Sequence, residues 1–131
     1  MPAVADPGSS VVRAAHDLDI PVVPLVGPVS LLLALAASGL NGQNFAFVGY
    51  LPQDGQERIQ RIKELEALSR RAAQAQLAIE TPYRNPVLLT ALLAHLQPST
   101  RLSVSCGLTL PDGWTRSDSV AGWRAKTPAL P

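Results

Sequence analysis

The stretch FAFVGYLPQDGQERIQRIKELEALSRRAAQAQLAIE, residues 45–80, decides the fold class of this chain. It opens with an aromatic, β-branched run at residues 45–51 and closes with a second strand-like run at residues 76–80. Between the two runs, Asp54 followed by Glu57 three residues later is a helix N-cap signal. An apolar stripe at helical spacing comes next, formed by Ile59, Ile62, Leu65 and Leu68. The sequence therefore predicts a strand, a helix and a second strand in succession.

The same alternation continues toward the C-terminus. The pattern predicts a loop at residues 81–86, an apolar helix at 87–96, strands at 101–106 and 114–117, and a short helix capped by Ser119 that runs through Trp123. Alternating strands and helices are typical of an α/β protein.

The residues before this stretch also suggest an α/β layer. The pattern predicts a surface helix at residues 9–19 that packs on one face, and a strand at Ile20–Val26 that is buried on both faces, as in a parallel sheet. A buried apolar helix at residues 30–38, ended by Gly39, follows. The turn-rich connection at residues 40–44 is the candidate boundary between two units.

Composition limits the classes of function. The 131 residues are 47% hydrophobic, and 11 basic against 10 acidic side chains leave a formal charge of +1, so no global field favours a nucleic acid or a membrane surface. The single cysteine, Cys106, and an N-terminus without signal-peptide character make a reducing cytoplasm the expected compartment. No ligand spacing for a metal is present, and the longest apolar run, residues 29–37, is too short to cross a bilayer.

Four short motifs follow one another in a fixed order. They are Pro2–Gly8 (PAVADPG), Val23–Pro28 (VPLVGP), Gly49–Pro52 (GYLP) and Glu80–Arg84 (ETPYR). This order resembles the tetrapyrrole methylase superfamily of S-adenosylmethionine-dependent methyltransferases. Within that superfamily the closest branch is the one that methylates ribose 2′-hydroxyl groups of small-subunit ribosomal RNA.

The resemblance implies two α/β domains with the methyl donor bound between them, usually in a homodimer. Residues 1–44 would then be the C-terminal part of the N-terminal, parallel-sheet, cofactor-binding domain. Residues 45–131 would form a C-terminal mixed α/β domain that is incomplete at its end. The family's early glycine loop and its Asp-x-Gly-Thr segment would belong before Pro2, so the chain is expected to be a partial one that is inactive alone.

The resemblance also assigns candidate site residues. Those expected to contact the cofactor S-adenosylmethionine are Pro2, Gly27, Pro28, Val29, Ser30 and Leu51. Glu80 and Arg84 are the catalytic candidates, with Glu80 as a general base for a ribose hydroxyl. Simpler interpretations stay open for each: a plain turn at Gly27–Pro28, a core position for Leu51, and an ion pair between Glu80 and Arg84 that orders a loop.

Three positions depart from the family pattern. Tyr50 replaces a phenylalanine, Tyr83 replaces a histidine, and Leu108–Thr109 is followed by Leu110 where the ribosomal RNA branch has a lysine. The sequence therefore leaves three functions open: a methyltransferase acting on ribosomal RNA ribose, a non-catalytic cofactor-binding or dimerisation module, and a methyltransferase for a tetrapyrrole or another small acceptor.

Overall fold

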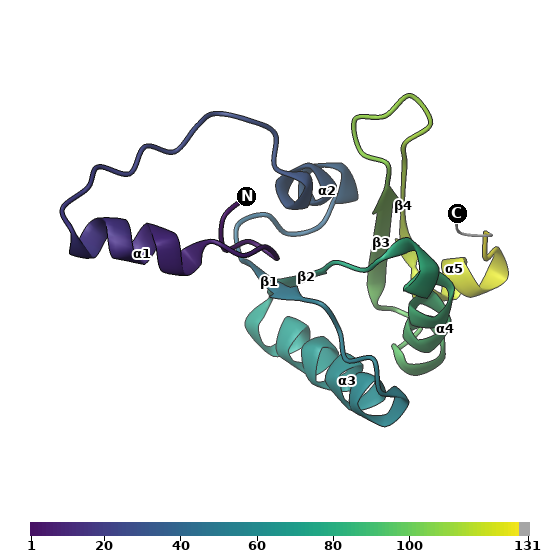
Figure 1. Cartoon of the computed structure of the whole chain (residues 1–131). Helices are drawn as coiled ribbons and strands as arrows, with labels where there is room; N and C mark the ends of the chain where they lie inside the picture. Colours follow the sequence, from purple (N-terminus) through teal and green to yellow (C-terminus); the bar gives the residue numbers. More distant parts are fainter. Residues whose placement is uncertain (129–131) are drawn as a thin grey trace.

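The computed structural model describes residues 1–128, which contain both helices and strands (Figure 1). The helices are α1 (Ser9–Asp17), α2 (Ser30–Ser38), α3 (Gly55–Ala72), α4 (Asn85–His95) and α5 (Val120–Ala125), and a 3₁₀ turn η1 (Pro82–Arg84) precedes α4. The strands are β1 (Phe45–Gly49), β2 (Ala75–Ala78), β3 (Arg101–Cys106) and β4 (Trp114–Ser119). The predicted α/β class is confirmed. The last three residues of the second predicted domain, 129–131, lie outside the described part.

Two pairs of strands form two small sheets. β1 and β2 run parallel, with Phe45 opposite Ala75 and Gly49 opposite Ala78, and α3 makes the crossover between them. β3 and β4 are antiparallel, with Arg101 opposite Ser119. Because β1 and β2 are parallel, the residues that follow both strands emerge at the same edge of the sheet.

The hydrophobic core lies between α3, α4, α5 and the strands. Its buried cluster consists of Leu51, Ile62, Leu65, Leu96 and Val120. Beside it, the fully buried Trp123 donates from its indole Nε1 to the carbonyl oxygen of Leu102 at 2.9 Å. Every one of these residues lies between positions 51 and 123, so the packed part of the molecule is its C-terminal two thirds.

Side-chain caps fix two of these helices where the sequence predicted them. The Asp54 carboxylate accepts hydrogen bonds from the backbone N–H groups of Gln56 and Glu57, both at 3.0 Å, and starts α3. The Ser119 hydroxyl accepts from the N–H of Gly122 at 3.0 Å and starts α5. Each cap satisfies amide groups that have no partner within the first helical turn.

The strand predicted at Ile20–Val26 is wrong. The segment is extended but belongs to no sheet of residues 1–128, and the side chains of Leu25 and Val26 are 91% and 106% exposed. Pro21 and Pro24 also have no backbone N–H to donate to a ladder. An apolar β-branched run becomes a strand only where a neighbouring strand pairs with it, and the described chain supplies none.

The two N-terminal helices form as predicted but are not buried as predicted. α1 has no buried residue, and Val11 on its apolar side is 72% exposed, so the expected packed face is wrong. α2 ends at Gly39, whose φ of 68° is the left-handed cap conformation, yet only Ser38 in this helix is buried. α2 lies against one end of the β3–β4 hairpin (Figure 1), which leaves Leu32 half exposed.

Candidate functional site

The carboxyl ends of β1 and β2 bring two of the sequence motifs together. Gly49 ends β1 with a φ of 72°, a conformation that strongly favours glycine, and directs the chain into Tyr50 and Leu51. At the end of β2, the N–H of Ile79 donates to the carbonyl oxygen of Gly49 at 3.1 Å. This contact holds the start of the Glu80–Arg84 motif beside the Gly49–Pro52 motif.

Glu80 and Arg84 form an ion pair at this edge. Arg84 Nε donates to Glu80 Oε1 at 2.8 Å, and the N–H of Thr81 donates to the same oxygen at 2.8 Å. The Glu80 side chain is 8% exposed and that of Arg84 is 22% exposed. The turn η1 makes this geometry possible, because it folds the chain back between the two residues.

The environment of Glu80 changes its acidity. Burial is the largest single influence and raises the pKa of Glu80, but hydrogen bonds from Thr81 and Arg84, with the Arg84 charge, together hold it below its ordinary value. Glu80 is therefore a carboxylate at neutral pH. Within residues 1–128 all its hydrogen bonds reach Oε1, and Oε2 has no hydrogen-bond partner there.

Two tyrosines flank Arg84, and sequence reasoning did not assign either to a site. The Arg84 guanidinium carbon lies 5.2 Å from the centre of the Tyr83 ring and 5.9 Å from that of Tyr50. Both distances are within the range of cation–π attraction. Tyr83 is 77% exposed and Tyr50 is 49% exposed. The sequence did contain one indication: Tyr50 replaces a phenylalanine of the family motif and Tyr83 replaces a histidine, so both positions keep an aromatic ring.

The structure places Leu51 in the hydrophobic core. Its side chain is 6% exposed and belongs to the buried cluster with Ile62 and Leu65. In this chain Leu51 therefore packs in the core, one residue after Tyr50.

Within the part of the chain that the structure describes, the predicted cofactor-binding residues before β1 are not hydrogen-bonded to the Glu80–Arg84 edge. Pro2 packs against Gly8, where a Cβ atom would lie 3.1 Å from the Cβ of Pro2. Val29 is the N-cap of α2 and accepts from the N–H of Leu33 at 3.0 Å, while Gly27, Pro28 and Ser30 are exposed. Over the described range 1–128, no hydrogen bond or ion pair joins these residues to Glu80 or Arg84. The assignment of these residues as contacts of the cofactor stays a prediction.

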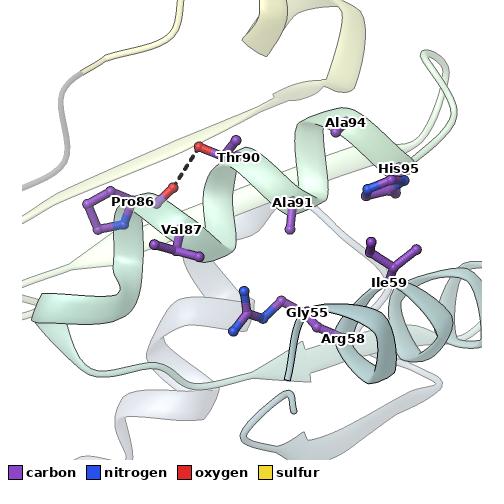
Figure 2. Close-up of a pocket in the computed structure, with 9 residues that line it drawn as sticks. All are labelled: Gly55, Arg58, Ile59, Pro86, Val87, Thr90, Ala91, Ala94 and His95. Atoms are coloured by element: carbon purple, nitrogen blue, oxygen red, sulfur yellow. Dashed lines mark hydrogen bonds between the residues drawn. The ribbon is translucent and has the colours of Figure 1, made fainter. Parts of the chain in front are cut away.

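A shallow apolar groove of about 440 Å³ lies between α3 and α4. Figure 2 shows Ile59 from α3 and Val87 and Ala91 from α4 along it. Arg58, at its edge, donates to the carbonyl oxygens of Pro52 and Gln53. Thr90, which also lines the groove, donates to the carbonyl oxygen of Pro86 at 2.8 Å, and His95 is the other polar side chain there. Because Arg58 and Thr90 are bonded to backbone carbonyl oxygens, the edge at Glu80 and Arg84 is the better candidate. Residues 1–128 contain no cluster of three or more metal-ligating side chains, and no helix among them could span a membrane.

Similarity to characterised proteins supports the motif-based resemblance. The chain is 36% identical over 108 residues to "Ribosomal RNA small subunit methyltransferase I" of Neisseria meningitidis serogroup B, covering 82% of this chain. Proteins with the same name from Streptococcus pyogenes serotype M6 and a Hydrogenobaculum species are 38% identical over 94 residues and 33% identical over 109 residues. The chain is homologous to these methyltransferases. The predicted resemblance is confirmed.

The match covers only part of each methyltransferase. The aligned segment is 35% of the Neisseria protein, 31% of the Streptococcus protein and 44% of the Hydrogenobaculum protein. It covers 72% of this chain in the Streptococcus comparison and 82% in the other two. No family model matches the chain. The chain thus spans less than half the length of these curated relatives.

Proposed function

We propose that this chain is part of an S-adenosylmethionine-dependent methyltransferase that modifies a ribose 2′-hydroxyl group of small-subunit ribosomal RNA. The observation that carries the proposal is the 36% identity over 108 residues to a ribosomal RNA small subunit methyltransferase. The proposed boundary between the two domains is at residues 44 and 45. A homodimer in the cytoplasm is the proposed working state.

The proposed catalytic residues are Glu80 and Arg84. S-adenosylmethionine would supply the methyl group, and residues 27–30 together with Pro2 and Leu51 stay proposed as its contacts. Arg84 is held through Nε by Glu80, and its terminal nitrogens would bind an acceptor phosphate. Oε2 of Glu80 would accept the proton of the attacking ribose hydroxyl, although its lowered pKa makes it a weak base.

A chimera tests this function. The segment of the Neisseria relative that matches this chain is replaced by the chain's own sequence. The chimera is then incubated with labelled S-adenosylmethionine and small ribosomal subunits from a bacterium that lacks the relative's gene. We expect label in a ribose of the ribosomal RNA. A chimera that melts cooperatively and binds the donor but transfers no label would reject the proposal.

A second candidate function is a non-catalytic module that binds the cofactor or a second subunit. The observation that favours it is that Glu80 is already engaged as an ion-pair partner. Its Oε1 accepts hydrogen bonds from Arg84 and Thr81, and its pKa is lowered, which makes it a poor general base. Under this function the Glu80→Gln chimera would keep donor binding and dimerisation. Under the proposed methyltransferase function it would lose most of its methyl transfer.

A further inference from the structure

We propose that Tyr83, Arg84 and Tyr50 form a stacking platform for an unpaired base of the RNA acceptor. The inference deepens the proposed function and rests on it for the choice of RNA. Its basis is that the two tyrosines that depart from the family pattern meet at one guanidinium, 5.2 and 5.9 Å from the ring centres.

Tyr83 is the outer part of this platform. Its ring lies beside the guanidinium of Arg84 and is nevertheless 77% exposed, so most of its surface is free for a further planar group. It stands in η1, one residue before Arg84, in a turn closed by the hydrogen bond from Arg84 N–H to Thr81 O at 3.0 Å. A ring held on an ordered turn loses little conformational freedom when a base stacks on it.

Arg84 gives the platform affinity for a nucleotide rather than for any flat molecule. Among residues 1–128 its only side-chain hydrogen bond runs from Nε to Glu80, so both terminal nitrogens remain as donors for a neighbouring phosphate. The Glu80 carboxylate offsets the arginine charge locally. A phosphate contact of Arg84 would add to stacking, so binding should weaken as the salt concentration rises.

Exposure also favours an RNA base over the adenine ring of the methyl donor. Small-molecule sites bury most of their ligand in a concave pocket, whereas single-stranded RNA bases stack on aromatic and arginine surfaces that are open to solvent. Tyr83 and Tyr50 are open in this way, and the proposed donor contacts at residues 27–30 have no hydrogen bond to Arg84.

The test measures binding of the 131-residue chain to a fluorescent single-stranded RNA of about eight nucleotides. Tyr83→Ala should weaken binding roughly 5- to 100-fold, the range expected for the loss of one stacked base. Tyr83→Phe should retain binding, because it keeps the ring. The matched control is Leu110→Ala, which removes another exposed apolar side chain, 60% exposed, from the β3–β4 connection and should change nothing.

Two further measurements distinguish a loss of base stacking from a loss of folding or of donor binding. Thermal melting of every variant should match the parent chain, since Tyr83 is not part of the core. Titration of the chimera with S-adenosylmethionine should give the same affinity with and without Tyr83→Ala. A loss confined to the methyl donor, an equal loss in Leu110→Ala, or no RNA binding by the parent chain would each overturn the proposal. Because no methyl transfer is measured, these results are independent of whether the chimera is active.

Discussion

Two amphipathic helices of this chain, α1 and α3, have different surroundings. Both carry apolar residues at helical spacing and charged residues on the remaining surface. In α3, Ile62 and Leu65 are buried in the core, whereas α1 has no buried residue and its Val11 is 72% exposed. Periodicity thus specifies which face of a helix can be buried, and the presence of a partner surface decides whether burial occurs.

The largest expected difference between the two regions is in amide hydrogen exchange. A nine-residue helix without buried contacts is marginal in water, whereas α3 opens only when the core opens. The amides of residues 14–17 should exchange at least about 1,000-fold faster than those of residues 62–65, for a core that is stable by about 5 kcal/mol. Exchange measured by mass spectrometry checks this. Equal protection would mean that α1 has a packing partner.

The second prediction concerns the core itself. Trp123→Ala removes a fully buried ring and its hydrogen bond to Leu102 O, and should lower the free energy of unfolding by about 3–5 kcal/mol. Denaturant unfolding monitored by circular dichroism measures the loss. Trp114→Ala is the matched control, since Trp114 is only partly buried and should lose less. Equal losses at the two positions would contradict the placement of the core.

The third prediction uses the pH dependence of the Glu80–Arg84 edge. The folded pKa of Glu80 is lowered, so the carboxylate stabilises the fold above its ordinary pKa of 4.5 and loses that contribution as pH falls through the lower folded value. Compared with Glu80→Gln, the parent chain should therefore lose additional stability on acidification below about pH 4.5. Thermal melting from pH 7 to pH 3 tests this. Parallel pH profiles for the two proteins would exclude a stabilising role for the ion pair.

The smallest expected effect is at Val11. Val11→Ala removes an apolar side chain that is 72% exposed, so the free energy of unfolding should change by no more than about 0.5 kcal/mol. Ile62→Ala, in the equivalent stripe of α3, should cost about 2–5 kcal/mol. A loss above about 1 kcal/mol at Val11 would show that α1 packs on another surface in solution.

Local signals predicted much of the fold. The Asp54 cap and the stripe containing Ile62 identified α3, and the alternation at residues 101–106 gave the observed bounds of β3. Ser119 was predicted as the cap of the last helix. These features depend on neighbours within a few residues, which the sequence contains directly. The strand predicted at Ile20–Val26 failed because its pairing partner is not local.

The candidate site was only partly predictable. The motif order pointed to Glu80 and Arg84, and the structure joins them by a hydrogen bond of 2.8 Å. Tyr83 and Tyr50 are 33 positions apart in the sequence, so nothing local indicated that they flank the same guanidinium. The parallel pairing of β1 with β2 brings the two motifs to one edge.

The sequence by itself determined the helix caps, the chemical character of each face and the homology to methyltransferases, because these depend on residue type and spacing. Only the tertiary structure decided that Leu51 is a core residue, that residues 20–26 have no sheet partner among the described residues, and that two tyrosines meet at Arg84. The physical reason is that burial and pairing are properties of two surfaces, and the second surface lies far away in the chain.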